Sequence, residues 1–297
     1  MSHDAGKNST VKFRRRLTTI FPTLPAILLL GVCFLIPIIS LLTDSFYSYV
    51  SNAVGGVDPS RRFTLINYIE FLNSRAYTNI FWNTLTISLI SAIAGLVISY
   101  PVAYYLSRPG KSKIKRLVFL LIVVSFFMNA IVRLYAWLLM LGDSGVVNLM
   151  LSFVGIAEVR FLNTPFAIEI AIVHWTLPII VMTLVGSLRN IPTSLYEAST
   201  SLGASSSHTF LHVTLPLSLP GIIASILLAF TLNMGAFIVP VVLGGGIVQM
   251  LASQIFLEFV EVANYPFGAT MATVLLVVTL SASYGINKLL GTKVTIK

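Results

Sequence analysis

The stretch Phe166–Leu188 reads FAIEIAIVHWTLPIIVMTLVGSL and carries a single charged side chain, that of Glu169. It exceeds the roughly 20 apolar residues that a helix needs to cross a bilayer. A strand of a membrane β-barrel needs only about ten residues of alternating polarity, and this stretch does not alternate. The stretch is therefore predicted to be a transmembrane α-helix.

Five other apolar runs of comparable length accompany this one. They occupy residues 20–42, 80–106, 117–141, 221–245 and 267–290. With 56% hydrophobic and only 10% charged residues, the chain cannot cover a water-soluble globule with polar side chains. We expect an all-α integral membrane protein with about six transmembrane helices. Its single membrane domain spans residues 20–291, between a basic tail (1–19) and a short tail (292–297).

The distribution of lysine and arginine predicts the orientation in the membrane. One set of segments holds most of the basic residues, with Asp4 and Glu197 as its only acids: 1–19, 107–116, 189–220 and the C-terminal end. The other set holds the remaining acids outside the apolar runs: 43–79, 142–165 and 246–266. Because positively charged segments stay in the cytoplasm, both termini are expected to be cytoplasmic.

Several functions are excluded by the residues present. A net charge of +9 is typical of a protein that binds nucleic acid. Here, however, the basic residues lie between apolar runs rather than along one aromatic-rich face. Gly110-Lys111-Ser112 resembles the end of a phosphate-binding loop, which needs a glycine where Tyr105 stands. His208 and His212 are four residues apart, without the cysteine or carboxylate that would complete a metal site. We expect no nucleic-acid partner, metal, cofactor or catalytic residue.

The connection between the fourth and fifth apolar runs contains a short pattern of its own. Ser194 and Glu197 have the spacing of a capping box, which predicts the start of a short helix. Gly203 can adopt the left-handed conformation that ends such a helix, and a second short helix is expected to run to Leu215-Pro216. The small side chains of Ala198-Ser199 leave room for a close neighbour. This weakly charged helix–turn–helix is predicted to dock into another protein.

The same residues resemble the coupling motif of ABC importer permeases. That motif reads Glu-Ala-Ala, then Gly, then Ile-x-Leu-Pro, and the chain has Glu197-Ala198-Ser199, Gly203 and Val213-Thr214-Leu215-Pro216 at the same spacing. Ser199 stands in place of an alanine and Val213 in place of an isoleucine. The resemblance implies that the following residues couple the chain to an ATPase subunit: Glu197, Ala198, Ser199, Gly203, Leu215 and Pro216.

Three further motifs resemble polyamine-type permeases, the spermidine/putrescine-like branch of this binding-protein-dependent family. They are Phe63-Thr-Leu-Ile-Asn-Tyr68, Ile131-Val-Arg-Leu-Tyr-Ala-Trp137 and Tyr265-Pro-Phe-Gly-Ala269. The resemblance implies a type I ABC importer permease of the bacterial inner membrane, which forms half of the translocation path for a small polar solute such as a polyamine or an opine. The implied partners are an ATPase dimer, a second and distinct permease, an external solute-binding protein and membrane lipid.

A proton-coupled secondary transporter of a small solute is the alternative interpretation. Such carriers usually have more spans, an internal repeat and several carboxylates inside the membrane. Glu169 is the only carboxylate within the six apolar runs. The sequence therefore favours the ATP-driven importer.

Two charged residues inside the predicted spans are candidates for the substrate path. A charge at the centre of a bilayer costs about 2.5 kcal/mol or more, so Arg133 and Glu169 each need a partner or a function. Counted at about 1.5 Å per residue along the third and fourth spans, the two lie at similar depths near the outer leaflet. We therefore predict an ion pair between them. The alternative for Arg133 is a bond to backbone carbonyls or to lipid headgroups.

Four other residues complete the candidate substrate path. Asn129 and Trp137 share one helical stripe of the third span, which either anchors the helix at the membrane surface or lines the path. Asn233, in the fifth span, either bonds another helix or meets the solute. His174, in the fourth span, either packs against other helices or binds the solute. It lies one turn before Pro178, whose missing amide predicts a kink or an opened turn of that span.

Overall fold

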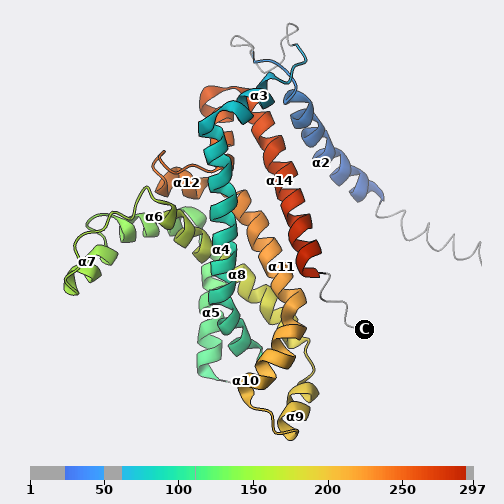
Figure 1. Ribbon diagram of the computed structural model, residues 1–297, viewed down its shortest axis with the longest axis vertical. Coiled ribbons are helices and arrows are strands. Elements are labelled where there is room, and N and C mark those ends of the chain that lie inside the picture. Colours follow the sequence, from blue (N-terminus) through green and yellow to red (C-terminus); the bar gives the residue numbers. More distant parts are fainter. Residues whose placement is uncertain (1–23, 50–61, 111, 292–297) are drawn as a thin grey trace, which may run out of the picture.

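The computed structural model describes residues 24–49, 62–110 and 112–291. Within these residues the chain is helical, and extended backbone pairs only in an isolated antiparallel bridge between Tyr47 and Phe63. The helices, shown in Figure 1, are α2 (Leu24–Asp44), α3 (Ile66–Asn73), α4 (Arg75–Ser107), α5 (Lys113–Phe127), α6 (Ala130–Leu141), α7 (Val146–Phe153), α8 (Pro165–Arg189), α9 (Thr193–Ser201), α10 (Ser206–Thr209), η2 (Phe210–Thr214), α11 (Leu215–Met234), α12 (Ile238–Leu243), α13 (Leu251–Leu257), η3 (Glu258–Val262) and α14 (Tyr265–Gly291). The predicted all-α fold is confirmed.

Five helical stretches of the described chain are long and apolar enough to cross a membrane. They are Arg75–Ser107, Ala130–Phe153, Pro165–Arg189, Ser206–Met234 and Tyr265–Leu289. A shorter apolar stretch, Leu28–Asp44, lies within α2 and belongs to the predicted first span, of which residues 20–23 are outside the described part. The length and composition of these helices agree with a protein that spans the membrane several times.

Three helices, α4, α8 and α11, form the centre of the bundle (Figure 1). They approach closely because glycines lie at their contacts. A Cβ added at Gly95 of α4 would lie 2.8 Å from Cδ1 of Ile180 in α8, and one at Gly221 of α11 would lie 2.3 Å from Cβ of Ser187. Small residues allow this close packing in membranes, where lipid is as apolar as a neighbouring helix and van der Waals contact drives association. α8 is thus held on two sides.

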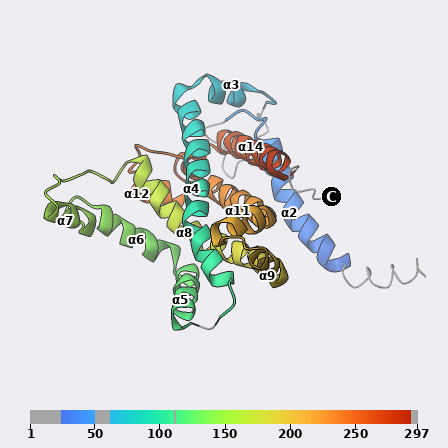
Figure 2. The same cartoon turned by 60° about the horizontal axis from the view of Figure 1, so that its bottom comes forward.

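The third apolar run is not one helix, so the prediction of a continuous span at 117–141 is wrong. α5 ends at Phe127, and α6 begins at Ala130 and runs in a different direction (Figures 1 and 2). Asn129 starts the new helix, because its Oδ1 accepts a hydrogen bond from the amide of Ile131 at 2.8 Å and so caps α6. In Figure 2, α6 and α7 extend from the bundle as an arm.

The fifth apolar run begins earlier than its predicted position at 221–245. The helix extends from Ser206 through α10, η2 and α11, so the second short helix expected in the 189–220 loop is the first part of this span. Pro216 has no amide to bond the carbonyl of His212, and the wider π-helical turn η2 precedes the proline without ending the helix.

The fifth run also ends early. The backbone oxygen of Asn233 accepts bonds from the amides of Gly235 and Ala236, which closes α11, and α12 begins only at Ile238. Pro178, by contrast, lies inside α8, which continues from Pro165 to Arg189. The opened turn, one of the two expected alternatives, is not found, and the kink stays a prediction. The irregular backbone lies in the third and fifth runs instead.

The helix α2 diverges from the rest of the molecule along most of its length (Figures 1 and 2). It is attached at the end that carries Ser45, whose carbonyl accepts a bond from Thr270 Oγ1 of α14 at 3.0 Å. The Ser45 hydroxyl also bonds the hydroxyl of Tyr68 in α3 at 2.7 Å. The large apolar side chains of α2 are mostly exposed, because few described residues pack against it.

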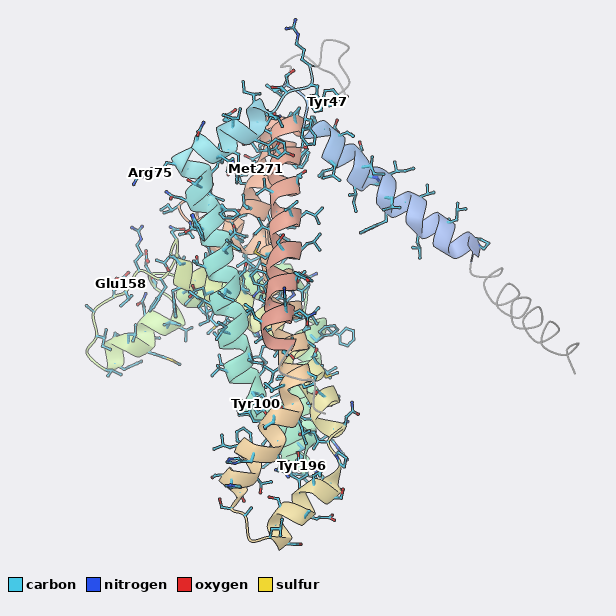
Figure 3. All side chains as sticks on the ribbon, turned by 45° about the vertical axis from the view of Figure 1, so that its right-hand side comes forward. Tyr47, Arg75, Tyr100, Glu158, Tyr196 and Met271 are labelled. Atoms are coloured by element: carbon cyan, nitrogen blue, oxygen red, sulfur yellow. The ribbon has the colours of Figure 1, made fainter. Side chains whose placement is uncertain are left out.

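The connections gather at two ends of the bundle. The loop after α4, the start of α5 and the helix α9 meet at one end, named the α9 end. α3 lies at the opposite end, named the α3 end; Tyr196 marks the first and Tyr47 the second in Figure 3. This grouping agrees with the charge pattern, which places 107–116 and 189–220 on one side of the membrane.

Candidate functional site

A cavity of about 260 Å³ lies where the two broken runs meet α8. Its walls come from α6, from α8 and from the irregular segment between α11 and α12: Ala130, Arg133, Leu134, Ala171, Trp175, Gly235, Ala236, Phe237, Ile238 and Val239. Non-helical backbone at membrane depth is tolerated only where protein buries it or where it lines a cavity. The two breaks and the cavity are therefore one feature.

Arg133 is the charged residue of this cavity and is only 4% exposed. Its Nη2 donates hydrogen bonds to the carbonyls of Ser125 and Met128, the latter at 3.3 Å. These carbonyls belong to the last turn and C-cap of α5, where no further helical amide follows to bond them. Its Nε is buried and has no partner among the described residues. The guanidinium thus stabilises the end of α5 at the edge of the cavity.

The predicted ion pair between Arg133 and Glu169 is wrong, because the two side chains form no contact of this kind within the described chain. Glu169 is half-buried in α8. Their depths were matched by counting residues along an uninterrupted third span, and the break at Asn129 removes that basis. It also brings Arg133 beside the carbonyls of its own run, as the alternative interpretation expected.

His174 joins three helices near the same cavity. Its Nδ1 accepts a hydrogen bond from the indole Nε1 of Trp137 in α6 at 3.1 Å. Its Nε2 lies 3.4 Å from the hydroxyl of Ser125 in α5. Because an indole N–H can only donate, Nδ1 is the acceptor. A neutral ring therefore carries its proton on Nε2, and this N–H donates a hydrogen bond to the Ser125 hydroxyl. The fold therefore brings Arg133, Trp137 and His174 together around the end of α5.

The other path candidates lie outside the cavity wall. Asn129 is an exposed helix cap, and Glu169 lies near the start of α8. Asn233 is fully buried, and its Nδ2 donates to the carbonyl of Ser88 in α4 at 3.2 Å, while its Oδ1 has no partner among the described residues.

Two aromatic residues of the wall, Trp175 and Phe237, were not among the residues predicted for the path. In the sequence, Trp175 directly follows His174 and Phe237 lies one turn after Asn233, but neither spacing distinguishes a residue of a cavity wall from one that only packs.

The helix α9 and the turn after it form a second functional feature. Gly203 has φ +79°, so the predicted left-handed conformation is confirmed. The amide of Gly203 bonds the carbonyl of Thr200, and the amide of Ala204 bonds that of Ser199, which is the hydrogen-bond pattern of a Schellman motif. The predicted capping box is wrong, since Pro192 occupies the N-cap without a side-chain bond. Pro192 already fixes the backbone there, and α9 starts one residue before Ser194.

The residues predicted for coupling divide between an exposed surface and the contacts that hold it. α9 has no buried residue, and Glu197 and Ala198 are exposed on it. Ser199 instead bonds the hydroxyl of Thr209 in α10 at 2.7 Å, which ties the two helices together. Leu215 and Pro216 are half-buried at the start of α11. The loop thus presents Glu197 and Ala198 on a short helix that is held by the turn at Gly203.

Residues 95–296 match the family described as "Binding-protein-dependent transport system inner membrane component". The chain belongs to this family. Its members are named as transport permeases, and the chain is accordingly a non-enzymatic permease subunit of a binding-protein-dependent ABC importer. The family assignment sets aside the proton-coupled carrier. It confirms the identification made from the coupling motif and the three branch motifs.

Two relatives and one solved structure illustrate the similarity. The chain is 36% identical over 239 residues to the "Spermidine/putrescine transport system permease protein PotB" of Haemophilus influenzae, covering 79% of this chain and 83% of that protein. It is 31% identical over 283 residues to the Escherichia coli protein of the same name, covering 94% and 96%. A chain of a "bacterial alginate ABC transporter in complex with alginate pentasaccharide-bound periplasmic protein" has the same fold, with a TM-score of 0.80, 18% identity, and coverage of 96% and 97%.

Proposed function

We propose that this permease imports a polyamine of the spermidine or putrescine type. The observation that carries the proposal is its similarity, over most of both chains, to permeases named for spermidine and putrescine transport. In the proposed complex it pairs with a second, distinct permease, two ATPase subunits and an external binding protein. Both termini and the α9 end face the cytoplasm, as the excess of lysine and arginine there predicts.

Glu169 and the aromatic part of the cavity wall favour a cationic solute, whereas Arg133 is itself a cation in that wall and its Nε has no partner among the described residues. Arg133 directs its charge to carbonyls of α5, while the carboxylate of Glu169 has no cationic partner among the described residues and is available to an ammonium group. Trp175 and Phe237 add aromatic side chains to the cavity wall, and aromatic faces attract ammonium cations. Asn129, Trp137, His174 and Asn233 remain proposed path residues.

In the proposed coupling step, Glu197 and Ala198 dock into the ATPase subunit, while Ser199 holds α9 against α10 through its bond to Thr209. Gly203 shapes the turn that follows α9, and Leu215 and Pro216 continue the loop into α11. Support comes from the exposed surface of α9 and from the Schellman motif that orders its end. Movement of the ATPase would then reach the membrane span directly, because α10, η2 and α11 form one continuous helix.

The test is uptake of radiolabelled spermidine by proteoliposomes that contain the complete complex and the binding protein. Uptake should require ATP hydrolysis, and Glu169→Gln should reduce it while Glu158→Gln, an exposed loop carboxylate, leaves it unchanged. Uptake driven by a proton gradient without ATP contradicts the proposed mechanism, and ATP-dependent uptake of an anionic solute in preference to spermidine contradicts the proposed cargo.

Orientation is tested separately by labelling single cysteines on a Cys33→Ala background, which removes the only native cysteine. Cysteine at Ser112 should react with an impermeant maleimide only from the cytoplasmic face, and cysteine at Ser74 only from the outside. The reverse pattern overturns the orientation.

A further inference from the structure

A second cavity, of about 790 Å³, opens at the α9 end of the bundle. It lies among the end of α4, the loop that follows, the start of α5, the end of α8 and the helix α9. One part of its wall carries basic side chains and the other part carries apolar ones. Neither the candidate substrate path nor the coupling surface uses this cavity.

Five cationic side chains converge on the cavity: Arg108, Lys113, Lys115, Arg116 and Arg189. None of the described residues that line it is acidic. The membrane orientation requires positive charge at this end, but that requirement is met equally well by side chains that spread apart into water. Convergence of five like charges on one hollow raises the electrostatic potential there and selects an anion.

Two of these cations are held in place by aromatic rings and backbone. The guanidinium carbon of Arg108 lies 4.6 Å from the ring centre of Tyr104 and 4.1 Å from that of Tyr196, and Arg108 also donates a hydrogen bond to the Tyr104 hydroxyl. The ammonium of Lys115 donates to the carbonyls of Arg108 and Pro109 at 2.5 and 3.5 Å. Arg108 and Lys115 are therefore positioned by contacts within the protein itself.

The start of α5 adds to the same field. Ser112 caps this 15-residue helix by accepting a bond from the amide of Ile114 at 3.2 Å. The helix N-terminus that lies at the cavity carries partial positive charge from its first amides, which favours an anion. Lys113 and Arg116 extend this charge with exposed side chains that form no ion pair within the described chain.

The remaining wall is apolar and continues into the membrane face of the protein. Leu106, Phe119, Leu188 and Ile191 complete the cavity. Phe119 is 44% exposed, and Leu117, Leu120 and Leu121 beside it are also largely exposed on α5. A ligand with a phosphate and an attached hydrocarbon chain fits this combination, whereas free phosphate uses only the basic half. Basic pockets between membrane helices on the cytoplasmic side have this chemistry.

We propose that this cavity binds the headgroup phosphate of an anionic phospholipid, with the acyl chains lying along the apolar side chains of α5. Because Tyr196 belongs to α9 and stacks on Arg108, an occupied site stabilises the position of the docking helix. The proposal adds a lipid ligand to the permease. Placing this lipid in the cytoplasmic leaflet rests on the orientation given under the proposed function.

The experiment measures lipid association directly. Spin-labelled phosphatidylglycerol is added to the purified full-length complex in phosphatidylethanolamine nanodiscs, and the immobilised fraction is measured by electron paramagnetic resonance. The double variant Lys113→Gln with Arg116→Gln is compared with Arg62→Gln with Arg75→Gln, which removes the same charge from exposed residues on the α3 side of the molecule. The first variant should lower the association constant by about fivefold per charge, and the second should leave it unchanged.

Three outcomes overturn the proposal. Equal loss in both double variants means that the lipid responds to net charge alone. Full displacement of the labelled lipid by millimolar inorganic phosphate identifies the ligand as the free ion. Binding to the isolated permease that disappears when the ATPase subunits assemble assigns the cavity to an acidic protein surface. Lipid association is measured without transport. The lipid proposal can therefore fail while the polyamine proposal stands, and the reverse.

Discussion

Replacing Gly203 by valine tests the docking model most directly. Gly203 has φ +79°, a conformation that a β-branched residue resists. A Cβ at this position meets no heavy atom within 4 Å, so the substitution creates no clash. The entire effect therefore comes from the backbone of one residue, which lies in the turn after a helix whose side chains are not buried.

The expected magnitude follows from that isolation. A non-glycine residue in the left-handed region costs about 1–2 kcal/mol, and valine belongs at the upper end of this range. About 2 kcal/mol lowers the equilibrium constant between the correctly turned loop and its alternatives by a factor of about 30. Since α9 contributes no buried residue, the bundle of α4, α8 and α11 should keep its stability while uptake per ATP hydrolysed falls, by at most that factor.

Gly155 provides a matched control in the same chain. It has φ +78°, its Cβ would also meet nothing within 4 Å, and it ends α7 with the same pair of bonds, from its own amide to Ser152 and from the Ile156 amide to Leu151. ATP hydrolysis and spermidine uptake are measured side by side for Gly203→Val and Gly155→Val. The docking model is refuted if both variants transport normally, or if they lose coupling to the same extent.

The remaining predictions concern packing and pH. Gly221→Ala should lower the thermal unfolding temperature of the solubilised protein, because its Cβ would lie 2.3 Å from Cβ of Ser187 and overpacking typically costs about 1–3 kcal/mol; Gly186→Ala, with nothing within 4 Å, should not. Glu258 in η3 is 5% exposed, and burial, together with the charge of Glu70, raises its pKa, although a bond from Gln254 partly opposes this. A carboxyl whose pKa is raised by folding contributes stability below its unfolded pKa of about 4.3 and loses it as pH rises through the folded pKa. Glu258→Gln should therefore become more stable relative to the native chain as pH rises, and a pH-independent difference between the two melting curves would contradict this reasoning.

The positions of the apolar runs were predictable because hydrophobic length is a property of composition. The breaks were not, since each depends on a few local bonds within an apolar run. Asn129 interrupts the third run through one side-chain cap, and the fifth run stops where the carbonyl of Asn233 takes the amides of Gly235 and Ala236. Pro178 carried the stronger sequence signal, yet α8 continues through it. A membrane span tolerates a proline because neighbouring helices and side chains satisfy the backbone groups that the proline leaves without a partner.

The candidate site likewise contains features that local sequence predicts and features that depend on the path of the whole chain. The conformation of Gly203 was predicted correctly, because left-handed backbone is a local preference that glycine satisfies. The ion pair of Arg133 with Glu169 was predicted wrongly, because the depth of a side chain depends on the path of the whole run. Trp175 and Phe237 enter the cavity wall only through the meeting of α8 with a broken helix, which no local pattern records.

The continuous helix from Ser206 to Met234 has a mechanical consequence. At 1.5 Å per residue its 29 residues make a rod about 43 Å long. One end follows directly after the turn at Gly203, and the other stops at Gly235, in the wall of the cavity. A rod of this length that tilts by about 5° carries its tip about 4 Å sideways, which is comparable to the width of an ammonium group. In the docking model, motion imposed at the loop therefore reaches the cavity as a displacement of several ångströms, and the non-helical segment between α11 and α12 is where the backbone can absorb it.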